Sequence, residues 1–268
     1  MRLLPVRRLL AAAALLSASV RTGLAADPAT AAPAVSIGAA ANLVYALAAL
    51  DAEFTRTHPD VELTSATGAS GNLVAQIHQG APYDVFLSAD LDFAQKLVRA
   101  GDASAPSLRT FAVGRLVLWT TKPGLGLESI GAVVRDPSVR KLAIANPATA
   151  PYGQAAMQAL EKLGLREAAQ PKLVRGENIS QTANFVETGN ADAGFVALSL
   201  VLSPKLQDRG RWLEVPGGLY APLAQAAVLT TRGASNPAAH AYLDFLGGSA
   251  AGEILEGFGY RLPAGGAH

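Results

Sequence analysis

The sequence predicts an α/β protein, and three observations carry this prediction. Short segments typical of strands alternate along the chain with segments whose apolar residues recur at helical spacing. Such alternation builds βαβ units around a mainly parallel sheet. The pattern starts again near residue 141, and roughly 240 residues follow the N-terminal leader described below, which is enough for two ordinary domains.

The elements follow one another at regular intervals. Strands are expected at residues 35–38, 61–65, 83–90 and 115–121 in the first half, and at 141–146, 172–175, 193–197 and 222–230 in the second. Helices are expected between and after them, ending near residues 58, 80 and 101, then at 154–163, near 189, at 237–246 and at 250–258. Asp84 and Asp90 are interpreted as structural, the first as a partner at a strand edge and the second as a helix cap.

The junction Gly68-Ala69-Ser70-Gly71-Asn72 is the first indication of a binding site. Its glycines let the backbone turn sharply, while the Ser70 hydroxyl and the free N–H groups of the following helix face the same way. A helix start of this kind holds an anion without a positive side chain. Asn42 follows the first strand, where its amide can cap a helix or donate outward, and two more helix starts lie near Tyr152 and Ile179. Each alone is typical of an ordinary N-cap, but four that converge at the carboxyl ends of strands favour a shared anion site.

The first 26 residues are expected to be a secretory signal peptide. Arg2, Arg7 and Arg8 precede an apolar run at 9–16, and small residues lead to a cleavage site near Ala26. The run is too short to span a membrane, so export is predicted in place of a membrane anchor. The Arg7-Arg8 pair leaves twin-arginine export open beside the general route. Residues 27–33 are expected to form a flexible tether.

Composition excludes several classes of function. Four of the 22 basic residues and no acidic ones precede Asp27, which leaves 18 basic against 21 acidic residues and a net charge of −3. Without a basic block, nucleic-acid binding is not expected. The chain has no cysteine, hence no disulfide, thiolate metal site or cysteine nucleophile. Its four histidines are scattered and show no metal-ligand spacing with a pair of carboxylates.

Several stretches resemble the periplasmic molybdate-binding proteins of ABC-type importers. They are residues 35–42, the turn at 68–73, the stretch Gly-Ala-Pro-Tyr-Asp-Val-Phe-Leu-Ser-Ala-Asp at 80–90, which is the most specific, and the closing Phe258-Gly259-Tyr260. The resemblance runs from about residue 35 to 263. It implies the type II periplasmic binding protein architecture, in which two doubly wound α/β lobes are joined by two crossover strands. Residues 34–113 and 226–268 would form lobe 1 and residues 114–225 lobe 2.

The same resemblance implies a function. The lobes would close on a bare tetrahedral oxyanion, molybdate or tungstate, and hold it by neutral donors. The protein would act in the periplasm as a monomer that delivers the anion to the membrane permease subunits of an ABC importer. It would need no cofactor and would not be an enzyme.

Carried over by position, the resemblance identifies five ligand-binding residues. Asn42 falls where the family has a Ser, Thr or Asn donor, and Ala41 precedes it, with only its N–H to offer. Ser70 matches the serine of the second turn. Tyr152 matches a loop position whose backbone N–H, and in some members a tyrosine hydroxyl, reaches the anion. Ile179 matches an aliphatic residue that contributes its N–H. Molybdenum would be bound only as the molybdate oxyanion, through Asn42, Ser70, Tyr152 and Ile179.

One position departs from the family pattern. Many members have a tyrosine in the strand that corresponds to 195–197, and here Ala197 takes its place. Tyr152 is expected to supply the missing hydroxyl from the opposite wall. Use of its backbone N–H alone is the alternative.

Other functions are weighed against this one. A secreted hydrolase would need a nucleophile elbow, and Gly68-Ala69-Ser70-Gly71 lacks the Gly-x-Ser-x-Gly spacing. A receptor for another tetrahedral oxyanion, such as sulfate or phosphate, is the closer alternative. Phosphate retains a proton and favours an acidic acceptor, whereas none of the candidate residues is acidic. An amino-acid receptor would need an arginine for the ligand carboxylate, and none lies at these helix starts.

Overall fold

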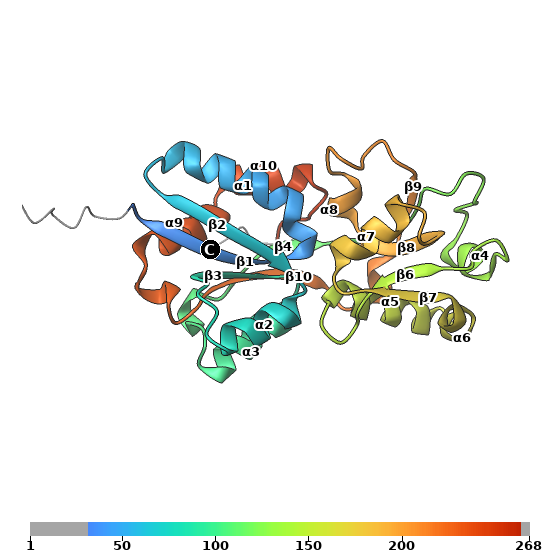
Figure 1. The fold of residues 1–268 in the computed structure, drawn as a ribbon, viewed down its shortest axis with the longest axis horizontal. Helices are drawn as coiled ribbons and strands as arrows, with labels where there is room; N and C mark the ends of the chain where they lie inside the picture. The colour runs from blue at the N-terminus through green and yellow to red at the C-terminus, as the bar shows by residue number, and fades with distance from the viewer. Residues whose placement is uncertain (1–31, 264–268) are drawn as a thin grey trace, which may run out of the picture. The chain divides into compact units, whose positions relative to one another are not determined.

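The computed structural model describes residues 32–263. The predicted signal peptide, residues 27–31 of the predicted tether and residues 264–268 lie outside the described residues. In the described part of the chain, no helix is long and apolar enough to cross a membrane. The chain forms two five-stranded sheets with helices on their faces, which confirms the predicted α/β class and its two lobes (Figure 1).

The first sheet has the strand order β2-β1-β3-β10-β4. Its strands are β1 (Ala34–Ala40), β2 (Glu62–Gly68), β3 (Val85–Ser88), β4 (Arg109–Gly114) and β10 (Leu223–Leu229). One face packs against α1 (Val44–Thr57), α9 (Pro237–Leu246) and α10 (Ser249–Gly257), and the other against α2 (Ser70–His78) and α3 (Leu91–Ala100) (Figure 1). Along β10, Ala227 and Leu229 pack in the core on the side of α1, α9 and α10, whereas Ala226 and Val228 pack in the core on the side of α2 and α3. The alternation of a buried strand therefore supplies both cores.

The second sheet has the order β7-β6-β8-β5-β9. Its strands are β5 (Leu116–Thr120), β6 (Leu142–Ala145), β7 (Leu173–Gly176), β8 (Ala193–Ala197) and β9 (Arg211–Glu214). Its helices are α4 (Ile130–Arg135), α5 (Pro151–Lys162), α6 (Arg166–Ala169), α7 (Ile179–Glu187) and α8 (Leu198–Val201). Short 3-10 turns complete the described chain at η1 (Ala41–Leu43), η2 (Ala105–Ser107), η3 (Gln170–Lys172), η4 (Gly217–Leu219) and η5 (Gly233–Ser235).

Both sheets are mixed: in each, four strands share one direction, in line with the expected mainly parallel sheet, and one strand runs the opposite way. Strands β1, β2 and β3 are mutually parallel, as are β6, β7 and β8, but β10 and β5 run antiparallel to their neighbours. The reason is that the chain enters β5 directly from the first sheet, between Gly114 and Leu116, and re-enters the first sheet at β10 after β9. A helix that connects two strands of one sheet brings the chain back to run in the same direction. Strands β5 and β10 are entered from the other sheet without such a helix, so they run the opposite way. The predicted residue boundaries of the lobes stay predictions.

Three polar residues with predicted structural roles can be followed into the fold. The Asp90 carboxylate accepts the Phe93 N–H at 3.0 Å and caps α3, as predicted. The Asp84 carboxylate accepts the Ser36 N–H at 2.9 Å, which confirms its role at the strand edge. Asn42 does not cap a helix, contrary to one reading of the sequence. It lies inside η1, whose N-cap is Ala40, so its side chain is directed elsewhere.

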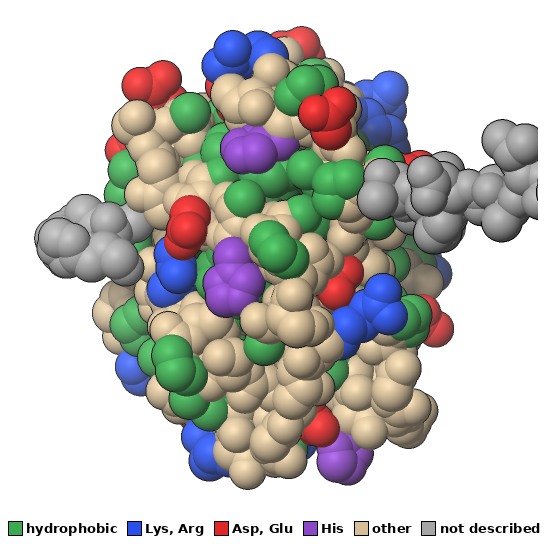
Figure 2. All heavy atoms as spheres, turned by 90° about the vertical axis from the view of Figure 1, so that its left-hand side faces the viewer, with side chains coloured by type: hydrophobic (Ala, Val, Ile, Leu, Met, Phe, Trp, Pro, Cys, Tyr) green, Lys and Arg blue, Asp and Glu red, His purple; other side chains and the backbone are tan. Residues whose placement is uncertain are grey.

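The surface seen from the β1 end of the first sheet carries charges of both signs. In Figure 2 the acidic and basic side chains are interspersed among apolar ones, and His side chains lie between them. This face shows no large basic area, in keeping with the charge balance of the sequence.

Candidate functional site

The residues predicted to bind the anion line one cavity, at the carboxyl ends of strands from both sheets. The cavity measures about 10 Å³, roughly what one water-sized sphere requires. Pockets for drug-sized ligands measure about 300–1,000 Å³, so this cavity suits a ligand of only a few non-hydrogen atoms. Its lining consists of Ala41, Asn42, Ser70, Tyr152 and Ile179 together with Ala40, Gly68, Ala69, Ala89, Ala150 and Pro151.

Four helix starts direct backbone N–H groups to this cavity. Ser70 and Ile179 are the first residues of α2 and α7, Tyr152 is the second residue of α5, and Ala41 and Asn42 open η1. N–H groups of a first turn have no partner within their own helix. Among residues 32–263, the structure gives these five N–H groups no acceptor. They are therefore free to donate to a ligand, and the positive helix ends favour a negative one.

The Ser70 side chain adds a hydroxyl donor. Ser70 is 1 % exposed, and its Oγ accepts the Ala89 N–H at 3.1 Å. This bond fixes the oxygen, while the hydroxyl hydrogen has no acceptor among the described residues. Because Ser70 lines the cavity, the hydroxyl can donate to an anion there.

The Asn42 side chain is directed into the protein. Its Nδ2 donates to Gln225 Oε1 and to the Tyr260 hydroxyl, each at 2.8 Å. Both amide hydrogens therefore have protein acceptors. The group of Asn42 that remains free for an anion is its backbone N–H. We therefore expect Asn42 to contact the anion through this N–H and not through its side chain.

The Tyr152 side chain is buried, with 1 % of its surface exposed. Its hydroxyl lies against Gly114, where an added Cβ would collide with it. Burial, with the nearby Tyr260 and Tyr220, raises the pKa of Tyr152 well above its usual value, so the hydroxyl stays neutral. Ala197, at the position where many relatives of the resembled family have tyrosine, is fully buried and is not part of the cavity lining.

The cavity lining carries no formal charge. Tyr152 is its only residue with an ionisable side chain, and that side chain is neutral. No cluster of three or more His, Asp or Glu side chains able to hold a metal ion occurs in the described part of the chain. The arrangement can therefore bind a compact anion by hydrogen bonds from neutral groups.

The two lobes touch around the cavity. The Gly71 N–H donates to the Thr149 carbonyl at 2.9 Å, which joins α2 to the loop before α5. The Ser199 hydroxyl donates to the Asn42 carbonyl at 2.8 Å, which joins α8 to η1. A ligand in the cavity is thus enclosed by both lobes.

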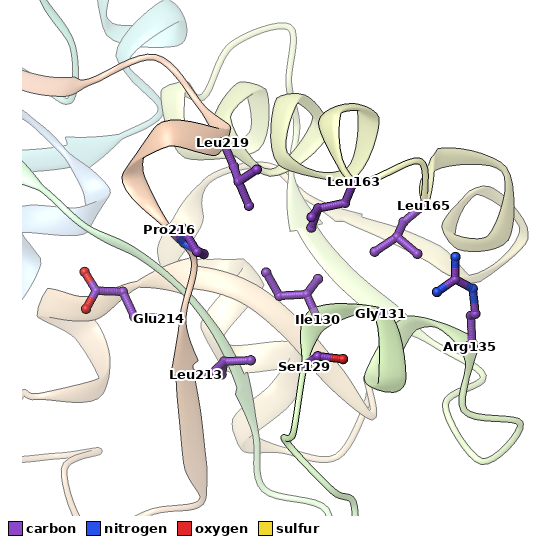
Figure 3. A pocket seen from close by; sticks show the side chains of 10 residues that line it. All are labelled: Ser129, Ile130, Gly131, Arg135, Leu163, Leu165, Leu213, Glu214, Pro216 and Leu219. Carbon is purple, nitrogen blue, oxygen red and sulfur yellow. The ribbon is translucent and has the colours of Figure 1, made fainter.

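A larger hollow of about 390 Å³ lies in the second lobe, between α4, the end of α5 and β9. Figure 3 shows Leu163, Leu165 and Leu219 around it, while the Glu214 carboxylate lies apart at one edge. The Ser129 hydroxyl in its wall already accepts the Ala132 N–H as the cap of α4. This hollow is apolar and lacks the converging donors of the smaller cavity, which is the better candidate for an anion site.

Sequence reasoning missed three buried polar residues behind the site: Ser199, Gln225 and Tyr260. Gln225 donates to the carbonyls of Ala89 and Leu223, each at 2.9 Å. Tyr260 lies within hydrogen-bonding distance of Ser199 Oγ and the Asn42 carbonyl, each at 3.1 Å. The available signal for Gln225 is that it is the only polar residue in the apolar strand β10. Tyr260 belongs to the closing stretch that resembles the family, but nothing in the sequence indicated a role for it at the site.

The chain is similar to known proteins over most of its described length. Residues 35–261 match the family described as "Bacterial extracellular solute-binding protein". The chain is 45 % identical over 228 residues to the molybdate-binding protein ModA of Azotobacter vinelandii, which covers 85 % of this chain and 90 % of that protein. It is 46 % identical over 198 residues to ModA of Rhodobacter capsulatus, covering 74 % and 77 %. The fold matches the solved periplasmic molybdate-binding protein of Azotobacter vinelandii with a TM-score of 0.80 and 35 % identity, over 85 % of this chain and 99 % of that one.

Proposed function

The chain belongs to the bacterial extracellular solute-binding proteins, and we propose that it binds molybdate in the cavity between its lobes. Proteins that are 45 % and 46 % identical to it are named as molybdate-binding. Both are binding proteins by name, and this chain is likewise a binding protein and not an enzyme.

The observation that carries the proposal is the convergence of neutral donors. Five backbone N–H groups and the Ser70 hydroxyl, contributed by both lobes, surround a cavity whose lining has no Lys or Arg. Dipoles fixed by the fold stabilise a charge without reorganising, and in a water-excluded site each bond is stronger than in water. A dianion held this way gains hydrogen bonds to a charged group, each worth about 1.5–3 kcal/mol.

The chemistry of the lining favours a fully ionised oxyanion. Hydrogen phosphate carries a proton that needs an acceptor, and the lining contains no carboxylate. Tungstate has nearly the size and charge of molybdate, so we expect it to bind as well. Sulfate is smaller, and it is the competing ligand that a rigid cage has to reject by fit.

The setting of the protein follows from the same family. We place the mature protein in the periplasm after removal of a signal peptide near Ala26, acting as a monomer. Its partners are the membrane permease subunits of an ABC importer, and it needs no cofactor besides the transported anion. The solved structure that matches with a TM-score of 0.80 is described as periplasmic, which supports this location.

Calorimetric titration of the purified mature protein tests the function. Molybdate and tungstate are expected to bind tightly with one site per chain, and sulfate and phosphate much more weakly. Tight binding of sulfate or phosphate, with weak or no binding of molybdate, would replace the proposed ligand by the other oxyanion.

A further inference from the structure

Among residues 32–263, three buried side-chain atoms lack a hydrogen-bond partner: Thr149 Oγ1 in the loop before α5, and two complementary atoms beside the cavity. The complementary atoms are Asn42 Oδ1, an acceptor on the first lobe, and the Tyr152 hydroxyl, a donor on the second. Each atom exposes less than 1 Å² to solvent. Buried polar groups without a partner are uncommon in folded proteins, so this pair calls for an explanation.

The orientation of the Asn42 amide is settled by its neighbours. Gln225 Nε2 lies 2.9 Å from the carbonyl oxygens of Ala89 and Leu223, which can only accept. The Gln225 oxygen must therefore face Asn42, which in turn must present its Nδ2. A flipped Asn42 amide would set two oxygens against each other. Oδ1 is thus a genuine acceptor without a donor.

The Tyr152 hydroxyl lies close to the same network. A Cβ added at Gly114 would collide with the Tyr152 hydroxyl and would lie 2.8 Å from Gln225 Nε2, so both groups flank Gly114. Gln225 in turn holds the Asn42 amide. Tyr260, which is bonded to the same amide, also lies near enough to raise the pKa of Tyr152.

We propose that the Tyr152 hydroxyl donates a hydrogen bond to Asn42 Oδ1 when the anion is bound. Tyr152 is then a positioning residue that fixes Asn42 from the opposite lobe, and only its backbone N–H contacts the ligand. This inference rests on the proposed function and deepens it, since it assigns the hydroxyl a role other than that of an anion ligand.

Other partners explain the two atoms less well. A bridging water would have to touch both, yet neither is open to a water-sized sphere. Gln225 Nε2 has no hydrogen left, so it cannot donate to Tyr152. If Tyr152 donated to Gln225 Oε1, Asn42 Oδ1 would still lack a donor. Thr149 lies against Gly71 of α2, and donation from its hydroxyl to Asn42 would leave the Tyr152 hydroxyl unsatisfied. A bond between Tyr152 and Asn42 satisfies both groups.

A double-mutant cycle on molybdate affinity tests the inference. Titrations compare the parent, Tyr152→Phe, Asn42→Ala and the double variant. Tyr152→Phe is expected to weaken binding about three- to tenfold, the worth of one neutral hydrogen bond. In the Asn42→Ala background the same change is expected to have no further effect, because the acceptor is gone. If Asn42→Ala does not fold, Asn42→Ser takes its place, since it also lacks the carbonyl.

Two control experiments accompany the double-mutant cycle. In a Ser70→Ala background, Tyr152→Phe is expected to keep its full effect, because Ser70 lies on a different part of the cavity wall. Tyr83→Phe removes an exposed hydroxyl bonded to Gln76 at 3.3 Å and is expected to leave the affinity unchanged.

The outcomes separate the two levels of the proposal. An equal effect of Tyr152→Phe with and without Asn42, or no effect in either background, would overturn the inference while tight binding by the parent upholds the proposed function. A parent protein that does not bind molybdate would overturn both.

Discussion

Replacing Ser70 with alanine removes a donor whose hydrogen has no other acceptor in the described structure. Ser70 Oγ lines the cavity and is fixed by the Ala89 N–H at 3.1 Å, so the hydroxyl hydrogen is left for the ligand. A hydrogen bond to a charged group is worth about 1.5–3 kcal/mol. Since about 1.4 kcal/mol corresponds to a factor of ten, Ser70→Ala should weaken molybdate binding roughly ten- to 150-fold. Calorimetric titration measures this directly.

Ser107→Ala is the matched control for this change. Ser107 is also buried, and its Oγ also accepts a backbone N–H, that of Leu229 at 3.0 Å. Its own hydrogen, however, goes to the Ser104 carbonyl at 2.7 Å, and it does not line the cavity. Both variants should lose thermal stability, but only Ser70→Ala should lose affinity. A folded Ser70→Ala protein that binds molybdate as tightly as the parent would refute the assignment of Ser70.

Three further predictions concern the closure of the lobes, the uncharged lining of the cavity and the ion pair between Arg115 and Glu214. Gly71→Ala would place a methyl group 3.0 Å from Thr149 Cα in the other lobe and from the Phe93 ring in its own lobe, so it should oppose closure and weaken binding about five- to 150-fold. Small-angle scattering should show a smaller radius of gyration with molybdate for the parent, and identical profiles would contradict closure. Affinity should change little with ionic strength, because the lining has no Lys or Arg, and a steep fall with salt would reveal a basic site. The hydrogen bond from Arg115 lowers the pKa of Glu214 from its usual 4.5, so the ion pair stabilises the fold above that pH and loses this contribution as the pH falls through the lower pKa of the folded state. Glu214→Gln should therefore lower the stability modestly at pH 7 and make the stability depend less on pH in acid. Identical acid unfolding curves for parent and variant would show that the ion pair contributes nothing.

The elements and the cavity residues could be predicted because their signals are local. Strand alternation, Pro151 in the first turn of α5 and the Asp90 cap are each readable within a few residues. The helix starts at Ser70 and Ile179 carry the same kind of signal. Their convergence then follows from parallel strands, whose carboxyl ends meet at one edge of a sheet.

The direction of the Asn42 amide could not be predicted, because its partners are remote. Gln225 and Tyr260 lie 183 and 218 residues further along the chain. A lone Asn after a strand suggests a cap or an outward donor, and only the folded arrangement shows that both amide hydrogens are taken. The reversed direction of β5 and β10 could not be predicted for a related reason, since it depends on which sheet the chain has just left.

The repeated plan of the two sheets accounts for the chemistry of the cavity. Each sheet ends two of its parallel strands in a turn that opens a helix or, after β1, the 3-10 turn η1, so each lobe contributes N–H groups of the same kind. When both lobes close, these donors replace the water around the anion from opposite sides, and the dipoles are already aligned when it arrives. A lysine or arginine would bind more anions but would discriminate less among them, because charge alone does not sense shape. A neutral cage places its donors at fixed points, so an anion that matches those points with all its oxygens is favoured over one that must give up a contact or bury a proton.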